Sequence, residues 1–299
     1  MQSDLKALEF DGIRRILERL TFSPYGADAA RNLEPAPDLS IVRQMQAAVT
    51  AARQVVDAYV MPRLQNVPDI RAALRQANQT GAALPASALH NLRMIMQIGL
   101  TLRELVANYP DLYSQIHTLK APARLVEALD KTINAAGRLR EDATPELDNL
   151  HKQFHQVQTA LEAQLKAFIA SPENAGYFDE NSRVQWHGMR AVLSVRAIHA
   201  DKLKGVRRGS SGGGRDVLIE PIEAVAHNNR LETLNGQIEG QNQIVLRAVT
   251  DTVREHLMDL NQLVDAITWV DLALAAGQFS AALNAVPPQM VDEPRVVLQ

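Results

Sequence analysis

Residues 144–171, TPELDNLHKQFHQVQTALEAQLKAFIAS, form the stretch of sequence that decides the fold. Apolar side chains recur in it at spacings of three and four residues, at Leu147, Leu150, Phe154, Val157, Leu161, Leu165 and Phe168. A helix with this heptad spacing presents one apolar stripe, as a coiled coil requires. Thr144 and Pro145 are typical of an N-cap and a first helical position. The sequence therefore predicts a long helix that needs a partner to bury its stripe.

A second long apolar pattern begins after Pro221 and runs from Val225 to Ile267, with a phase slip near Gly236 and Gly240. Between the two patterns lies the one β-like region, at about residues 183–220. Met189–Val195 alternates apolar and polar residues, and Val217–Ile219 is a short apolar run. One helix would lead out and the other would return beside it, so the sequence predicts an antiparallel coiled-coil arm capped by a small β tip.

The remaining sequence carries helical spacing throughout and no convincing strand before residue 140. Breaks occur at Ser23–Gly26, Glu34–Pro37, Gly81 and Pro85, and the long stretches between them favour helices. The predicted fold class is mainly α. A helical core comprises residues 1–143 and 250–299, and the arm at residues 144–249 is inserted into it.

Composition excludes several kinds of protein. The 299 residues contain no cysteine, so a disulfide framework, a thiolate metal site and a cysteine nucleophile are ruled out. The first residues carry no secretory signal pattern, and no apolar stretch is long enough to span a bilayer. We expect a cytoplasmic protein that does not bind membranes. Aromatic residues make up only 4%, which disfavours extensive base stacking.

Charge is unevenly distributed along the chain. The formal net charge is −3, yet residues 183–215, the basic window, contain eight cations against the single acid Asp201. The window thus carries +7 and the rest of the chain −10. Its cations are Arg183, Arg190, Arg196, Lys202, Lys204, Arg207, Arg208 and Arg215. Several cations on one exposed surface can neutralise phosphates, so we predict a nucleic-acid contact here. The alternative is a solvated, salt-bridged surface.

Two features of the basic window have less specific interpretations. Trp186 is expected to anchor the core of the small sheet rather than to stack on bases. The segment Gly209–Gly214 could cradle a phosphate, but it lacks the Lys-Ser/Thr pair that should follow, so a flexible hairpin loop is favoured. No base-specific readout follows from this sequence.

No catalytic or metal site is predicted. His151 and His155 have the i, i+4 spacing of a metal-binding helix, but the glutamate of the H-E-x-x-H motif is missing between them. We therefore favour two solvated histidines. The acids Asp130, Glu141 and Asp142 could form carboxylate pairs, although acids near helix ends are common. No Ser-His-Asp arrangement can be recognised.

Several short stretches, taken in order, resemble the MutS family and specifically its bacterial MutS-two subfamily, which lacks the mismatch-reading domain. The stretches are Leu8–Asp11 with Ile13 and Leu17, Gly26, Arg31–Pro35, Val67–Ile70, Ile133–Asn134 with Gly137, Ala143–Leu147, Ser210–Gly212, Val217–Pro221, and Asn228–Asn229 with Leu231. The resemblance covers almost the whole chain. The glycine-rich segment 209–215 and the pair Arg215-Asp216 depart from the family pattern.

The resemblance implies a helical core with an inserted lever-and-clamp arm, a homodimer, and an ATPase domain that follows in sequence. The phosphate-binding motif G-x-x-x-x-G-K-[ST] is absent, so ATP and magnesium are expected only for a full-length relative. The expected function is a non-catalytic clamp and dimerisation scaffold in DNA repair, recombination control or ribosome rescue. It would bind duplex or branched DNA, or structured RNA. The alternatives are a purely structural coiled-coil interaction module and, with least support, an enzyme whose active site lies in the helical core.

Overall fold

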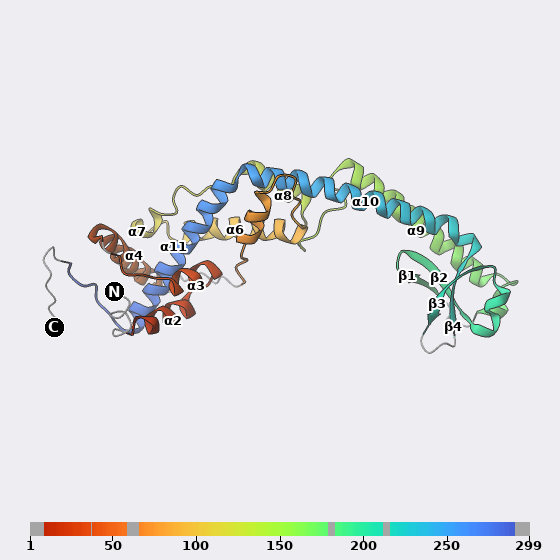
Figure 1. Ribbon diagram of the computed structural model, residues 1–299, viewed down its shortest axis with the longest axis horizontal. Helices are drawn as coiled ribbons and strands as arrows, with labels where there is room; N and C mark the ends of the chain where they lie inside the picture. The colour runs from red at the N-terminus through yellow and green to blue at the C-terminus, as the bar shows by residue number, and fades with distance from the viewer. Residues whose placement is uncertain (1–8, 37, 59–65, 179–182, 212–215, 291–299) are drawn as a thin grey trace. The chain divides into compact units, whose positions relative to one another are not determined.

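The computed structural model describes residues 9–36, 38–58, 66–178, 183–211 and 216–290 (Figure 1). The chain divides into two compact units. Unit 1 comprises residues 1–138 and 247–299, and unit 2 comprises residues 139–246. The long helix α10, Ile222–Glu255, contributes its residues up to Leu246 to unit 2 and the rest to unit 1. Each unit has its own buried core and is described by itself.

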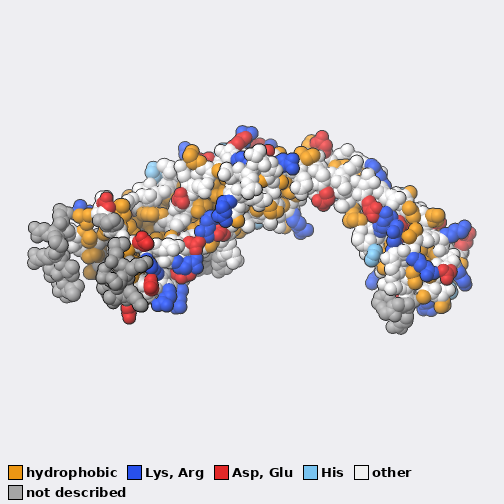
Figure 2. All heavy atoms as spheres, viewed as in Figure 1, with side chains coloured by type: hydrophobic (Ala, Val, Ile, Leu, Met, Phe, Trp, Pro, Cys, Tyr) orange, Lys and Arg blue, Asp and Glu red, His pale blue; other side chains and the backbone are white. Residues whose placement is uncertain are grey.

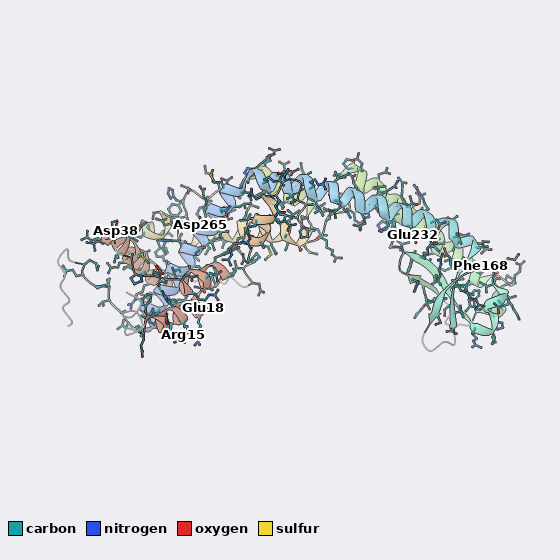
Figure 3. The ribbon with its side chains drawn as sticks, viewed as in Figure 1. Arg15, Glu18, Asp38, Phe168, Glu232 and Asp265 are labelled. Atoms are coloured by element: carbon teal, nitrogen blue, oxygen red, sulfur yellow. The ribbon has the colours of Figure 1, made fainter. Side chains whose placement is uncertain are left out.

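Unit 1 is helical throughout its described residues. Local sequence sets several helix starts: the side chain of Ser23 caps α3 by accepting the Gly26 N–H, and Asp38, labelled in Figure 3, caps α4 by accepting the Ser40 N–H. Besides the end of α10, its helices are α2 (Phe10–Leu20), α3 (Pro24–Arg31), α4 (Leu39–Asp57), α5 (Arg71–Ala77), α6 (Ala86–Leu105), α7 (Pro110–Tyr113), α8 (Ala123–Thr132) and α11 (Leu257–Ala282).

Helix α11 is the centre of unit 1. It packs against α2, α3, α4 and α6, and it is apolar on nearly all sides, as a buried helix must be. Gly277 allows the closest approach: a Cβ there would lie 2.8 Å from the backbone carbon of Ala52 on α4. Small residues at this crossing let the two helix backbones meet, so the core of unit 1 forms around α11.

In unit 2, helix α9, Pro145–Ala170, packs beside the first part of α10 (Figure 1). The predicted helix start is confirmed, because Thr144 accepts the Leu147 N–H at 3.2 Å and Pro145 opens the helix. All seven residues of the apolar stripe are buried or partly buried in two clusters shared with α10 and the sheet. Leu147 meets Ile238 and Val245 in one cluster, and Leu161 and Leu165 enter the other.

A four-stranded antiparallel sheet, in the order β1-β2-β4-β3, joins the two helices of unit 2. The strands are β1 (Val184–His187), β2 (Arg190–Arg196), β3 (Gly205–Ser211) and β4 (Asp216–Pro221), with short 3-10 turns η1 (Ala175–Tyr177) and η2 (Ala197–Lys202). The register sets Leu193 opposite Ile219 and Val195 opposite Val217. These side chains face α9 and α10, because alternate residues of a strand point to the same side.

The sheet has more strands than the sequence predicts. The alternating run at Met189–Val195 and the apolar run at Val217–Ile219 correspond to β2 and β4, but β1 and β3 were not predicted. The interpretation of Gly209–Gly214 as a loop is wrong at its start, since Gly209 and Ser210 pair with β4. Gly209 follows a β-bulge and has a φ of 151°, a value that only glycine adopts readily. Residues 212–215 lie outside the described residues.

Two helix predictions also need correction. The apolar pattern from Val225 to Ile267 belongs to two helices, because α10 ends at Glu255 and α11 begins at Leu257. At the break, the His256 N–H bonds to the Val253 carbonyl at 3.0 Å, a three-residue closure that ends the α-helical ladder. The helical spacing also predicts a helix from Leu119 to Leu129, whereas in the structure this helix begins at Ala123, directly after Pro122. Among the described residues, no helix is both apolar and long enough to cross a bilayer.

Candidate nucleic-acid interface

Glu220 on β4 is the acid that two arginines of the sheet bind. Its side chain is fully buried, and its carboxylate accepts hydrogen bonds from Arg190 (2.7 Å), Arg208 (2.6 Å) and Asn228 (2.9 Å). Burial alone would raise the pKa of Glu220, but these three hydrogen bonds outweigh it and hold the pKa below the ordinary glutamate value. Glu220 is therefore an anion that fixes two arginines of the basic window from inside the sheet.

Helix α10 completes the hydrogen bonding of this sheet. Asn228 accepts the Ala191 N–H at 2.9 Å and donates to the Ala191 carbonyl at 3.0 Å. Ala191 lies beyond the residues of β2 that pair with β4, because β4 turns into α10 after Pro221. The carboxamide thus takes the place of a strand neighbour and satisfies two buried backbone groups.

Arg190 connects the same helix to the sheet. Besides Glu220, its guanidinium donates to both carboxylate oxygens of Glu232 at 2.7–2.8 Å and to the side chain of Asn229 at 2.8 Å. Glu232 comes from α10 and is labelled in Figure 3. The Arg190 side chain is only 17% exposed. With its charge neutralised by two glutamates, Arg190 has a structural role in this arrangement.

The structure separates the eight predicted cations into distinct groups. Arg190 and Arg208 bind Glu220, and Arg207 pairs with the exposed Asp201. Three more are exposed and, within the described part of the chain, form no ion pair: Arg183, Lys202 and Lys204. Arg196 is exposed and has an interaction partner. Arg215 lies outside the described residues.

Four exposed cations lie on or beside the connection from β2 to β3. This cationic connection consists of Arg196, Lys202, Lys204 and Arg207, and Asp201 is the one acid within residues 196–207. Lys202 ends η2, and the Lys204 carbonyl accepts the Ile222 N–H at 3.1 Å, which anchors the connection to the start of α10. Figure 2 shows Lys and Arg side chains over the sheet of unit 2, with acidic side chains among them. This exposed strip could neutralise phosphates.

Trp186 does not anchor the core of the sheet as predicted. Its side chain is 38% exposed, because it lies on β1, an edge strand, opposite the small residue Ala191. The core below the sheet is instead aliphatic, with Leu193, Val195 and Ile219 at its centre. One large aromatic surface is therefore accessible on the same sheet that carries the cationic connection.

The acids considered as carboxylate pairs have other partners. Asp130 pairs with Arg93 at 3.3 Å, and Asp142 binds Arg140 through two hydrogen bonds of 2.9 Å. Glu141 lies beside the two histidines of α9. None of the three acids forms a pair with another acid in the described structure.

Asp271 on α11 in unit 1 was not predicted. It is fully buried, accepts the Phe22 and Ser23 N–H groups at 3.0 and 2.9 Å, and contacts Ser23 Oγ at 2.5 Å. Burial raises the pKa of Asp271 to about 6, against the lowering effect of these hydrogen bonds. The sequence did contain an indication: an acid in the apolar run from Ile267 to Ala276 must have buried donors. Ser23 is the N-cap of α3, so Asp271 fastens that helix start to α11.

Unit 1 also has an apolar groove of about 710 Å³ between α2, α4 and the residues after α11. Its lining includes Phe10, Met45, Phe279 and Val286, and the ionisable groups in it are Glu34 and Arg53. Arg53 is already bonded to Asn284 at 3.0 Å and to backbone carbonyls. The groove lacks the convergent polar groups of an active site, so it gives the enzyme hypothesis no support.

Comparison with known proteins shows where similar sequences occur. No protein-family model matches the chain. Curated relatives named endonuclease MutS2 match it at 26% identity in Synechocystis sp., 25% in Pelotomaculum thermopropionicum and 21% in Halothermothrix orenii. These matches cover 97–100% of the chain but only 37–38% of each relative, so the chain spans less than two fifths of their length. The similarity supports a relationship between this chain and the MutS2 family.

Proposed function

We propose that this chain is a non-catalytic, nucleic-acid-binding scaffold of a MutS2-like protein that acts in DNA repair or recombination control. The relatives are named endonucleases, and the similarity to them runs along nearly the whole chain. The observation that carries the proposal is the cationic connection on the sheet of unit 2. Its lysines, Lys202 and Lys204, are exposed and without an ion-pair partner among the described residues.

The domain roles belong to the same proposal. Residues 1–143 and 250–299 would form the helical core, and residues 144–249 would form a lever and clamp arm built on a coiled coil. The compact unit at residues 139–246 and the apolar stripe shared by α9 and α10 support this interpretation. A pair of helices that bury a common stripe can hold a sheet in a fixed orientation at their end.

The chemistry of the contact is phosphate neutralisation. Arg190 and Arg208 shape the sheet through Glu220, whereas Lys202 and Lys204 have their ammonium groups available. Ammonium groups bind phosphates as point charges and release counterions, which makes affinity fall with salt but does not read sequence. We therefore expect similar affinity for different duplex sequences. Branched DNA and structured RNA are further ligands of the same chemistry.

For the longer protein, we also propose a homodimer and action on ribosomes. We assign ATP and magnesium to that longer protein, because the motif G-x-x-x-x-G-K-[ST] is absent from this sequence. No nucleotide step is therefore assigned to this chain. A purely structural coiled-coil module is not favoured, since such a role gives no reason for exposed cations on the sheet of an otherwise acidic chain.

The test measures binding of fluorescent duplex DNA to the whole chain at several salt concentrations. Replacing both lysines (Lys202→Glu and Lys204→Glu) should weaken binding at least about tenfold and reduce the salt slope by about two. The matched control, Lys120→Glu with Lys131→Glu, makes the same charge change on exposed lysines of unit 1 and should change affinity much less. Equal losses in the two double variants, or none in either, would refute a contact at the cationic connection.

A further inference from the structure

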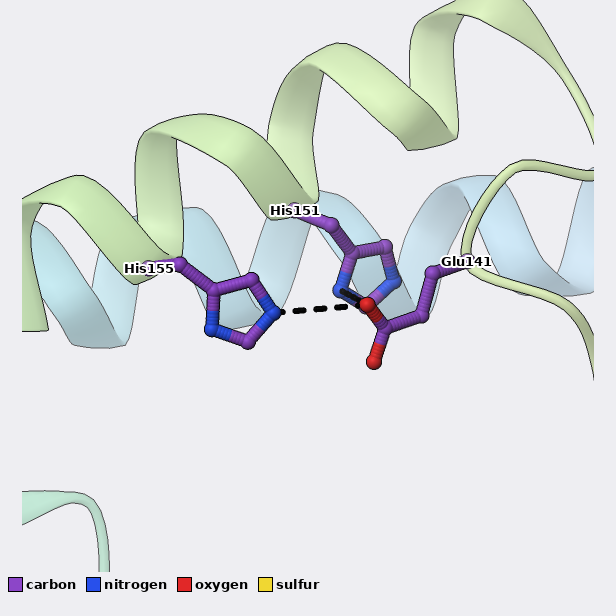
Figure 4. A group of neighbouring side chains, drawn as sticks. All are labelled: Glu141, His151 and His155. Carbon is purple, nitrogen blue, oxygen red and sulfur yellow. Dashed lines mark hydrogen bonds and ion pairs between the residues drawn. The ribbon is translucent and has the colours of Figure 1, made fainter.

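Unit 2 brings together three potential metal ligands, of which the sequence connects only the two histidines. His155 Nε2 lies 3.3 Å and His151 Nδ1 lies 3.9 Å from the same carboxylate oxygen of Glu141. Figure 4 shows both imidazoles on one side of α9, with the glutamate reaching them from the preceding loop. The three ligand atoms all lie within 4.8 Å of one another. A third potential ligand is thus supplied from before the helix.

Local structure holds these ligands in place. The histidines are four residues apart on α9 and therefore neighbours on one face of the helix. Glu141 lies in a turn closed by the Ala143 N–H to Arg140 carbonyl bond of 3.2 Å. On either side of it, Leu139 and Ala143 pack on the apolar cluster of α9 and α10. The loop that carries the glutamate is consequently fixed against the helix that carries the histidines.

The cations nearest in sequence have carboxylate partners of their own. Lys152 pairs with Asp148 at 2.6 Å, and Arg140 binds Asp142 through two bonds of 2.9 Å. Neither pairing involves Glu141, so its carboxylate is shared only between the two imidazoles among the described residues. One carboxylate and two imidazoles form the donor set of many zinc sites.

We propose that Glu141, His151 and His155 bind a divalent first-row transition-metal ion, and that zinc is the preferred ion. Ligand atoms around tetrahedral zinc are about 3.4 Å apart when the bonds are about 2.1 Å long. The distances of 3.3 and 3.9 Å from the histidine nitrogens to the Glu141 oxygen are close to this value. Small side-chain rotations would bring the three ligand atoms to the spacing of a zinc site. Three protein ligands leave a fourth position for water or another donor. Bound metal would fix the loop before α9 to that helix. This role does not depend on whether the sheet binds nucleic acid.

The test titrates zinc chloride into the whole chain after removal of metals with a chelator, and follows heat and thermal unfolding. One equivalent should bind and raise the unfolding temperature of unit 2. The variants His151→Ala, His155→Ala and Glu141→Gln should each weaken binding at least about tenfold. They are partly or fully exposed positions, and circular dichroism would confirm that the helices remain.

His187→Ala is the matched control, because His187 is an exposed histidine on β1 of the same unit. It should bind zinc as the parent does. Cobalt(II) provides a second readout, since a tetrahedral site with nitrogen and oxygen ligands gives visible absorption that the three variants should lose. Absence of saturable binding at one equivalent would overturn the proposal. So would equal zinc affinity in the parent and the Glu141→Gln variant, which would leave only two surface histidines.

Discussion

Among the described residues, each unit buries one carboxylate completely, but the two are stabilised in opposite ways. Asp271 in unit 1 is held by backbone N–H groups and a serine hydroxyl, and none of the partners seen for it is a cation. Glu220 in unit 2 is held by two arginines and a carboxamide. Burial raises the pKa of Asp271 to about 6, whereas hydrogen bonds from Asn228, Arg208 and Arg190 bring the pKa of Glu220 below its ordinary value.

The difference shows what each acid does for its unit. Neutral donors can fasten a helix start, but they leave the charge of ionised Asp271 uncompensated in the core of unit 1. Glu220 instead keeps two guanidinium groups ordered on a small sheet. The stability of the two units should therefore change in opposite directions as pH falls. They can be followed separately, because Trp269 lies in unit 1 and Trp186 in unit 2, and the chain has only these two tryptophans.

The largest effect is expected from Glu220→Gln. The change leaves the partly buried Arg208 without an anion, so it should destabilise unit 2 by about 3–5 kcal/mol, as loss of one partner of a buried pair does. Denaturant unfolding of a Trp269→Phe background, in which Trp186 reports on unit 2, measures this loss. Glu223→Gln, an exposed acid at the start of α10, is the control and should be nearly neutral. A loss below about 1 kcal/mol for Glu220→Gln would mean that Glu220 does not organise the sheet.

A fall in pH should first raise the free energy of unfolding of unit 1 and should lower that of unit 2 only at more acidic pH. The pKa of Asp271 is raised from 3.8 to about 6, so its ionisation opposes folding. The full shift corresponds to about 3 kcal/mol, of which about 2 kcal/mol of added stability should appear as pH falls from 7.5 to 4.5. The pKa of Glu220 is lowered, so its contribution is retained above about pH 4.5 and lost below. The measurement is unfolding at each pH, with Trp269 alone reporting on unit 1.

Asp271→Asn provides the control for this pH effect, because it removes the titration and should flatten the stability of unit 1 between pH 4.5 and 7.5. Asp28 and Asp69, also in unit 1, have lowered pKa values, so their protonation lowers the stability of unit 1 only at more acidic pH. If unit 1 of the parent lost stability steadily from pH 7.5 to 4.5, the contrast between the two carboxylates would not hold.

A smaller effect should follow from Asn228→Ala. This change leaves the N–H and carbonyl of Ala191 without their partner and removes one hydrogen bond to Glu220. We expect unit 2 to lose about 2 kcal/mol, since each buried polar group left unsatisfied is costly. Asn229→Ala, at the exposed neighbour whose side chain accepts a hydrogen bond from Arg190, should cost less. Equal losses at both positions would argue against the carboxamide as a substitute strand partner.

The smallest effect has the opposite sign. Gly236 lies in the interior of α10, is exposed, and a Cβ there would meet no atom within 4 Å. Gly236→Ala should stabilise unit 2 by about 0.5–1 kcal/mol through helix propensity. Gly205→Ala should destabilise the same unit, because its Cβ would clash with the backbone carbonyl of Glu220. Thermal unfolding distinguishes the two, and a destabilising Gly236→Ala would contradict the open environment of that glycine.

Local patterns in the sequence were sufficient to predict the long elements of unit 2. The cap at Thr144, the stripe from Leu147 to Phe168 and the runs of β2 and β4 all have a clear period. Strand β3 was missed because Gly205, Gly209 and Ser210 favour loops, and its pairing with β4 outweighs that preference. The break at His256 was missed because the apolar period continues through it.

The candidate site was only partly predictable, because charge spacing in a sequence does not show which ions pair. Glu232 lies 42 residues from Arg190, and Ser23 lies 248 residues from Asp271. Glu141 meets His155 only because a loop folds back along α9. The basic window contains the exposed lysines, but two of its arginines bind Glu220, and only the fold distinguishes the two groups.

The most direct test of the proposed contact is lysine labelling of the whole chain with and without saturating duplex DNA. Limited acetylation, read by mass spectrometry, gives the reaction rate of each lysine. We predict that bound DNA slows modification of Lys202 and Lys204 severalfold, while Lys120 and Lys131 in unit 1 react as before. If DNA binds and the rates at Lys202 and Lys204 do not change, the cationic connection is not the nucleic-acid interface.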